Sequence, residues 1–294
     1  MIELIGDLGF CYGVNHAIET LSKAAEENHS VFLTHPLLHN KKENESLLRK
    51  NHASVLSPET DTANGAVVFS AHGHAPDEEK EYPHARLYDA TCPLILRRYE
   101  AISKAGDLAI VFLGKRGHQE TVAFMGRFPD FLFVDCRGDI EKQLDAMKLE
   151  GKRTGLVPQT TVGKSVYDRC LVYLKAKTDL RFALPICPIY EKRHNDVLTY
   201  FAGKNPSQYY LVVCGDLSSS NANELLTSAL VSYPGLDGTI AMEASDINLA
   251  DVAPRQIVLC SSTSASRKSV LRLKAELEKK QKKINKPQAS LSES

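Results

Sequence analysis

The sequence predicts an α/β protein made of three small parallel-sheet modules around one central site. Short apolar runs of strand length alternate with amphipathic stretches of helical length through most of the 294 residues. This alternation is typical of strand–helix–strand units with parallel strands, and it argues against a β-meander. Three cysteine contexts of similar form recur at wide intervals along the chain, which favours three modules of similar layout.

The expected strands are the short apolar runs, taken in chain order. They are Ile2–Ile5, Val31–Thr34, Ala66–Ser70, Leu87–Ala90, Leu108–Leu113, Phe131–Val134, Thr154–Val157, Tyr209–Cys214, Thr239–Met242 and Gln256–Cys260. The expected helices are the intervening stretches with apolar residues at helical spacing. They include Val14–Asn28, Leu94–Ala105, Thr161–Lys175, Asn223–Val231 and Ser266–Lys283.

These elements divide into three predicted modules and a tail. We expect the first module at residues 12–92, the second at 93–186, and the third at 187–284 together with 1–11. Residues 285–294 follow a Lys-rich stretch and are rich in serine, a composition typical of a disordered tail.

Composition excludes several classes of partner. Lys plus Arg and Asp plus Glu each number 36, so neither nucleic acid nor another polyanion is an expected partner. No apolar stretch approaches the ~20 residues that span a bilayer, so no membrane association is expected. No signal peptide opens the sequence, and seven cysteines is an odd number for a disulfide scaffold. A reducing, cytoplasmic location is therefore predicted.

Cys11, Cys92 and Cys187 are the most informative residues of the chain. Their contexts are GFCYGV, DATCPL and LPICPI, and each follows a short apolar run and precedes a helix-like segment. A helix N-terminus stabilises a thiolate through its dipole and free N–H groups. A buried structural thiol explains each cysteine alone equally well, but their matched contexts favour one shared soft-metal centre. Three ligands would leave one metal position open for a substrate.

Polar side chains follow the expected strands where helices begin. In open parallel sheets such turns gather at the carboxyl ends of the strands, where N–H, hydroxyl and amide donors bind anions. Helix capping is the commoner explanation of any one turn taken alone, but together they predict a phosphate or diphosphate pocket. A Walker loop and a Gly-x-Gly-x-x-Gly turn are missing, so a nucleotide is not expected. The residues are His72, His118, Glu120, Thr160, Thr161, Ser219, Ser220, Asn221 and Ser264.

Other histidines and cysteines have plainer interpretations. His35 and His39 lie in THPLLHN after a strand, and His35 is interpreted as a surface histidine. His72 and His74 lie two positions apart in a loop, which is weak support for a metal pair. Cys214 and Cys260 lie within apolar runs and are expected to be small core residues.

Taken in order, the motifs resemble those of a known family. GFCxGV, HN, FSAHG, DATCPL, GHxE, QTT, IC and SSNxN resemble the 4-hydroxy-3-methylbut-2-enyl diphosphate reductases, the IspH or LytB family of isoprenoid biosynthesis. The resemblance extends from about Gly9 to Ser264. DATCPL and the SSNxN loop are the most specific of its motifs.

The resemblance implies a fold, a cofactor and a set of site residues. The fold is three α/β modules in a pseudo-threefold arrangement around a [4Fe-4S] cluster, with Cys11, Cys92 and Cys187 as ligands and one iron open to the substrate hydroxyl. Glu120 matches the residue that delivers protons, and Thr160 matches the one that orients this hydroxyl. His118 is expected to be a third catalytic residue beside Glu120 and Thr160. The implied diphosphate-binding residues are His39, His72, His118, Ser219, Ser220, Asn221 and Ser264.

The resemblance also implies a reaction and a partner. Two electrons and two protons would remove the hydroxyl of the allylic diphosphate as water, giving isopentenyl and dimethylallyl diphosphate in the last step of the non-mevalonate pathway. No flavin or nicotinamide motif is visible in the sequence. The electrons are therefore expected from outside the chain, and the resemblance implies a ferredoxin or a flavodoxin as their donor.

The chain departs from the family pattern near the predicted ligands. Tyr190 stands where the family has Thr, Gln119 where it has Pro, and Val122 where it has Glu. A bulky Tyr190, so close to Cys187, could reshape the substrate pocket. One alternative is therefore a diverged paralogue that reduces another hydroxylated substrate.

Two further alternatives change the chemistry. A zinc-dependent hydrolase would use His72, His118 and Glu120, but it leaves the three cysteine contexts unexplained. A non-catalytic iron–sulfur redox sensor is weakened by the presence of Glu120 and Thr160.

Overall fold

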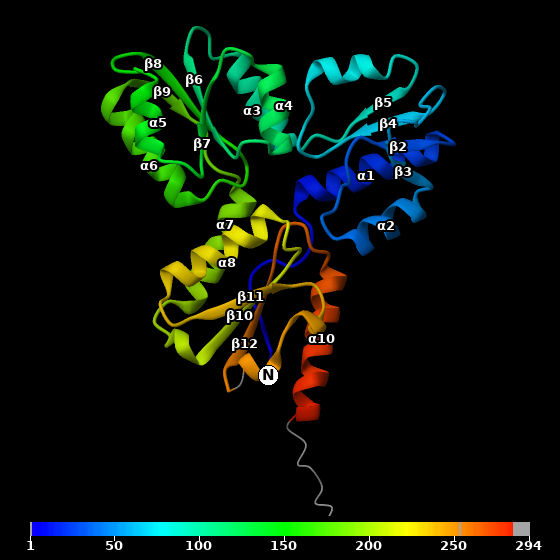
Figure 1. Cartoon of the computed structure of the whole chain (residues 1–294), viewed down its shortest axis with the longest axis vertical. Coiled ribbons are helices and arrows are strands. Elements are labelled where there is room, and N and C mark those ends of the chain that lie inside the picture. The colour runs from blue at the N-terminus through cyan, green and yellow to red at the C-terminus, as the bar shows by residue number, and fades with distance from the viewer. Residues whose placement is uncertain (1, 253, 285–294) are drawn as a thin grey trace, which may run out of the picture. The chain divides into compact units, whose positions relative to one another are not determined.

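The computed structural model describes residues 2–252 and 254–284, and the predicted tail at 285–294 lies outside them. The chain divides into two compact units, Cys11–Glu191 and Met1–Phe10 with Lys192–Ser294. The larger unit contains two four-stranded sheets and the smaller unit contains one, and every strand pair is parallel (Figure 1). The predicted α/β fold of three parallel-sheet modules is confirmed. The module boundaries and the pseudo-threefold arrangement stay predictions.

The first sheet of the larger unit has the strand order β3-β2-β4-β5. Its strands are β2 (Val31–Leu33), β3 (Ala53–Val55), β4 (Ala66–Phe69) and β5 (Arg86–Asp89). Helices α1 (Tyr12–Glu27) and α2 (Lys41–Lys50) and the 3-10 helix η1 (Pro76–Glu81) accompany it. Leu21 of α1 is fully buried with Leu33 and Val68, so the apolar face of this helix covers the sheet.

The second sheet has the order β7-β6-β8-β9. Its strands are β6 (Ala109–Gly114), β7 (Leu132–Asp135), β8 (Arg153–Pro158) and β9 (Asp179–Ala183), and its helices are α3 (Pro93–Ser103), α4 (Gln119–Arg127), α5 (Ile140–Ala146) and α6 (Lys164–Lys177). Along β6, Val111 and Leu113 belong to one core cluster, whereas Ile110 and Phe112 belong to another. Both faces of the sheet are therefore covered, which is why its central strands read as continuous apolar runs.

The sheet of the smaller unit has the order β1-β12-β10-β11. Its strands are β1 (Glu3–Leu4), β10 (Tyr209–Cys214), β11 (Asp237–Ala241) and β12 (Gln256–Ser261). The remaining elements are α8 (Ser220–Ser232), α9 (Leu249–Val252), α10 (Arg267–Ile284), η2 (Pro206–Gln208) and η3 (Ala244–Asp246), while α7 (Pro188–Phe201) begins in the larger unit. Cys214 and Cys260 are buried in its two core clusters, as predicted.

Two strands, β3 and β9, were not predicted from the sequence. Both lie at the edge of their sheet, and most of their side chains are partly or fully exposed. An edge strand needs apolar residues on less of its surface, so the apolar-run pattern is weak there. Across the described residues, no helix combines the length and apolarity needed to cross a membrane.

Candidate functional site

Cys11, Cys92 and Cys187 each lie at the N-terminal end of a helix in the larger unit. Cys11 is the N-cap of α1, and its Sγ accepts a hydrogen bond from the Val14 N–H at 3.5 Å. Cys92 is the N-cap of α3. Cys187 directly precedes α7, and its carbonyl accepts the Glu191 N–H at 2.9 Å. The three thiols therefore sit where helix dipoles favour negative charge, as their contexts indicated.

The three thiols are close enough to influence one another's ionisation. Burial is the main cause that raises the pKa of Cys92 to about 11, and the charges of Cys11 and Cys187 raise it further. None of the seven cysteines, all of which lie among the described residues, forms a disulfide. At neutral pH Cys92 is therefore a protonated thiol, and a soft metal that binds there must displace its proton. This donor set of three neighbouring thiols fits an iron–sulfur group.

Gly13 leaves room beside these thiols. A Cβ atom at this position would lie 2.7 Å from Cys92 Sγ and 3.9 Å from Cys11 Sγ. Gly13 is the second residue of α1 and its φ is not positive, so the backbone itself permits alanine. The glycine is therefore required by the sulfur atoms and not by the helix.

Gly13→Ala is expected to lower iron and sulfide incorporation while leaving the fold intact. The added methyl group must displace Cys92, and overpacking of this kind costs about 1–3 kcal/mol. Iron and sulfide per chain after anaerobic reconstitution would measure the loss, with Asn15→Ala, an exposed position of the same helix, as the control. Equal iron content in Gly13→Ala and wild type would contradict the steric role.

Glu120 is a buried acid held by Thr160. Glu120 belongs to the first turn of α4 and is 2% exposed. Its Oε1 accepts the Thr160 N–H at 2.9 Å, and its Oε2 accepts the Thr160 hydroxyl at 2.6 Å. Burial raises the pKa of Glu120, while Arg98 and the hydrogen bonds from Thr160 oppose this rise. A carboxyl group with a raised pKa can hold a proton near neutral pH and release it to a bound molecule.

Gln159 fixes the turn that carries Thr160. This buried side chain follows β8, and its Oε1 accepts the Lys115 N–H at 2.8 Å and the Thr121 hydroxyl at 3.3 Å. Its Nε2 donates to the Thr161 hydroxyl at 2.8 Å. One amide thus joins the loops after β6 and β8, which carry Glu120 and Thr160. The QTT motif contains this residue, but its role could not be read from the sequence.

His72 and His118 face each other across two turns of the larger unit. Their ring centroids are 5.0 Å apart in an edge-to-face arrangement. Burial lowers the pKa of His72 to about 3, with smaller contributions from His118, His39 and His35. Burial also lowers the pKa of His118 to about 4, with help from Lys115 and His39. Both rings are therefore neutral at pH 7, and the exposed His39 lies near enough to affect both.

The hydrogen bonding of His118 decides which of its nitrogens can donate. Its Nδ1 accepts the Glu120 N–H at 3.2 Å, because His118 is the N-cap of α4. In the neutral ring the proton is then assigned to Nε2, which can donate to an anion.

The residues of the zinc alternative do lie together. His72, His118 and Glu120 bring three ligand atoms within 4.8 Å of one another. Zinc at either nitrogen of His118 would break its capping bond, and both oxygens of Glu120 already accept from Thr160. The arrangement suits hydrogen bonding to an anion better than metal binding.

His35 and His74 take no part in this arrangement beyond His35's effect on the pKa of His72. His35 is exposed, as predicted, and its Nδ1 lies 3.3 Å from the Thr34 hydroxyl. His74 is buried, stacks on Phe69 at 3.9 Å and pairs with Glu79 at 2.8 Å. It serves the core, so a metal pair with His72 is not formed.

Ser219, Ser220, Asn221 and Ser264 belong to the smaller unit. Ser219 is the N-cap of α8, and its hydroxyl lies 3.3 Å from that of Ser264. Asn221 is 4% exposed, its Oδ1 accepts the Thr263 N–H at 2.8 Å, and its Nδ2 has no hydrogen-bond partner among the described residues. A buried unpaired donor is costly, and an anion at this helix N-terminus would satisfy it.

Two residues that differ from the family pattern, Tyr190 and Val122, lie in different surroundings. Tyr190 is 2% exposed and lies in the apolar core beside the second sheet, together with Ile186 and Tyr167. Its ring therefore fills the core. Val122 is exposed on the outer face of α4, whereas Glu120 is on the buried face of the same helix.

Arg98 is a residue of this region that sequence reasoning missed. It contacts the turns before Thr160 and Cys187 and lies 3.9 Å from the carboxylate of Glu120. One feature of the sequence could have identified it: Arg98 is a basic residue on the apolar face of a helix, at helical spacing from Ile95 and Ile102.

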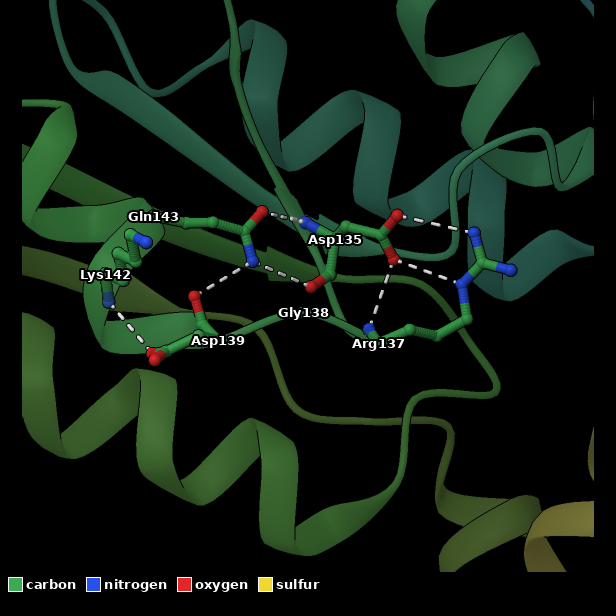
Figure 2. A pocket seen from close by; sticks show the side chains of 6 residues that line it. All are labelled: Asp135, Arg137, Gly138, Asp139, Lys142 and Gln143. Carbon is green, nitrogen blue, oxygen red and sulfur yellow. Dashed lines mark hydrogen bonds and ion pairs between the residues drawn. The ribbon is translucent and has the colours of Figure 1, made fainter.

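A surface cavity elsewhere in the larger unit has no link to the predicted residues. It lies at the end of β7, where Asp135 accepts from Arg137 and Gln143 bonds the Asp135 backbone (Figure 2). Its lining residues are Asp135, Arg137, Gly138, Asp139, Lys142 and Gln143. Their polar groups bond mainly with one another.

The chain is similar to several known proteins that are all named as diphosphate reductases. A 4-hydroxy-3-methylbut-2-enyl diphosphate reductase of Chlamydia trachomatis serovar D is 29% identical over 253 residues, 79% of each chain. Reductase 2 of Burkholderia mallei is 31% identical over 228 residues, 74% of this chain and 67% of the relative. The solved E-1-hydroxy-2-methyl-but-2-enyl-4-diphosphate reductase of Plasmodium falciparum shares the fold with a TM-score of 0.78 at 20% identity, covering 100% of this chain and 93% of that one.

The family model described as LytB protein matches residues 2–287, nearly the whole chain. This match agrees with the ordered motifs and with the three parallel sheets described above. The chain therefore belongs to the LytB family.

Proposed function

We propose that this protein reductively removes the hydroxyl group of 4-hydroxy-3-methylbut-2-enyl diphosphate. Two electrons and two protons would release the hydroxyl as water and leave isopentenyl and dimethylallyl diphosphate, the last step of the non-mevalonate pathway. Membership of the LytB family and the names of its relatives support this reaction. The observation that carries it is a buried acid, Glu120, in the same unit as three neighbouring cysteine thiols.

Membership of this family implies an iron–sulfur cofactor, and we infer a [4Fe-4S] cluster. Cys11, Cys92 and Cys187 would hold it, and the space beside Gly13 supports this assignment. When bound, the cluster supplies the electrons, and an iron without a protein ligand supplies a Lewis acid.

Glu120 and Thr160 would supply the protons and orient the substrate. Burial keeps the pKa of Glu120 raised, so its carboxyl group can hold a proton until the hydroxyl leaves. The Thr160 hydroxyl bonds Glu120 and can also accept a bond from the substrate hydroxyl, aligning it with the acid.

The family resemblance implies two sets of diphosphate-binding residues, and each is described within its own unit. In the larger unit, His118 offers its Nε2–H, and His72 and His39 add neighbouring imidazoles that an anion would favour in the protonated form. In the smaller unit, Ser219, Ser220 and Ser264 offer hydroxyl groups, and Asn221 offers its unpaired Nδ2. Binding energy from the diphosphate, remote from the reacting carbon, would orient the hydroxyl.

We further propose a ferredoxin or a flavodoxin as the electron donor and the cytoplasm as the location. The sequence has no flavin or nicotinamide motif of its own. Seven cysteines that form no disulfide suit a reducing compartment.

The test is oxidation of a reduced viologen dye by the anaerobically reconstituted protein on addition of 4-hydroxy-3-methylbut-2-enyl diphosphate. Iron and sulfide are measured on the same sample. We expect rapid dye oxidation that depends on the substrate. An intact cluster without oxidation would instead indicate a paralogue with another substrate, and zinc without sulfide would indicate a hydrolase.

A further inference from the structure

Arg98 is a buried cation on the helix that begins at a predicted cluster ligand. It lies in α3, whose N-cap is Cys92, and it is 9% exposed. Its neighbours on the buried face are Ile95, Tyr99 and Ile102. Because a buried guanidinium is costly unless its donors are used, its partners indicate its role.

The guanidinium of Arg98 joins two turns that carry site residues. Its Nη1 donates to the carbonyl of Pro158, the last residue of β8, which lies two residues before Thr160. Its Nη2 donates to the carbonyl of Pro185 at 2.8 Å, two residues before Cys187. These two bonds connect α3 to both turns.

The same guanidinium lies beside the predicted proton donor. Its Nη1 is 3.9 Å from Glu120 Oε1, and both side chains are about nine-tenths buried or more. Burial raises the pKa of Tyr99 in α3, and the charge of Glu120 raises it further. Thr160, in the turn after β8, donates its backbone N–H to the Glu120 carboxyl group. His118 caps the helix of Glu120, with His72 close by.

We propose that Arg98 is a positioning residue that fixes the Glu120–Thr160 pair relative to Cys92 and Cys187. The proposal rests on the proposed function. The planar guanidinium group donates to the carbonyls of Pro158 and Pro185 and lies beside the Glu120 carboxylate. One side chain therefore holds the proton-delivering groups and two of the three cysteines in place. Lysine could retain the charge, but its single ammonium group could not reproduce the bridge between the two carbonyls.

The experiment compares Arg98→Gln, Arg98→Lys and the wild type, with Arg97→Gln at the exposed neighbouring position as the control. Three kinds of measurement are made: the rate of iron loss to a chelator, the steady-state constants kcat and KM with reduced viologen, and the pH profile of kcat. Iron loss needs no substrate, so it tests the bridge to Cys187 even if the proposed reaction fails.

For Arg98→Gln we expect iron loss about 10-fold faster and kcat about 100-fold lower, with KM within about 3-fold, since a misplacement of about 1 Å has effects of this size. Activity needs protonated Glu120, so it falls as pH rises through the pKa of this acid. Loss of the neighbouring cation removes a charge that lowers the pKa of Glu120, so that falling limb should move to higher pH. Arg98→Lys should have the falling limb of the pH profile of kcat at its wild-type position, but it should still lose iron faster than the wild type.

Two results would overturn the proposal. The first is wild-type iron loss, kcat and pH profile in Arg98→Gln. The second is a lower melting temperature in Arg98→Gln and Arg98→Lys with all three kinds of measurement unchanged, which would make Arg98 a structural residue only. If Arg98→Gln does not fold, the iron retention of Arg98→Lys decides: wild-type retention would overturn the bridging role, and faster loss would support it.

Discussion

Replacing Cys92 with serine is expected to remove the iron–sulfur cofactor and with it all measurable turnover. Serine offers a hard oxygen ligand in place of a soft thiolate, and burial disfavours an alkoxide even more than it disfavours the thiolate of Cys92. Cys92 is also the thiol that lies nearest to the space left by Gly13. Iron and sulfide should fall to about a tenth of the wild-type content or less, since loss of even an outer-shell partner of a metal ligand costs about 10- to 100-fold in metal affinity.

The matched control is Cys136→Ser. Cys136 is also partly buried in the larger unit, but it packs against the core of the second sheet. It should retain iron, sulfide and activity. Full cofactor content in Cys92→Ser would contradict the ligand assignment, and equal losses in both variants would point to a general loss of folding.

Replacing Glu120 with glutamine is expected to leave the cofactor in place and to reduce turnover by about 10²- to 10⁴-fold, the usual contribution of a positioned acid. Glutamine has the same shape, and its amide oxygen can still accept the Thr160 N–H. It cannot release a proton at neutral pH. Substrate binding should change little, because Glu120 is not among the residues proposed to hold the diphosphate.

Calorimetry and single-turnover kinetics separate binding from chemistry in this variant. Glu100→Gln is the control, since Glu100 is an exposed carboxylate of α3 that pairs with Lys104. An active Glu120→Gln enzyme would exclude Glu120 as the proton donor. Loss of iron in this variant would instead indicate that the Glu120–Thr160 contact supports the cysteine turns.

The sequence alone determined most of the strands and helices and the order in which they occur. Strand and helix patterns are local, because burial of both faces makes continuous apolar runs and burial of one helical face makes a periodic pattern. For the same reason the positions of Cys11, Cys92 and Cys187 at helix starts could be read from short contexts. The edge strands β3 and β9 were not predicted, because partly exposed strands lack a continuous apolar run.

Only the tertiary structure decided which side chains act on one another. The bond between Thr160 and Glu120, the bridge from Arg98 to two proline carbonyls, and the burial of Tyr190 all join or bury residues distant in sequence. The lowered pKa values of His72 and His118 and the raised pKa of Cys92 follow from burial, which depends on the whole fold. Residue types and turns are local properties that a sequence carries, whereas desolvation and contact geometry arise only when distant segments meet.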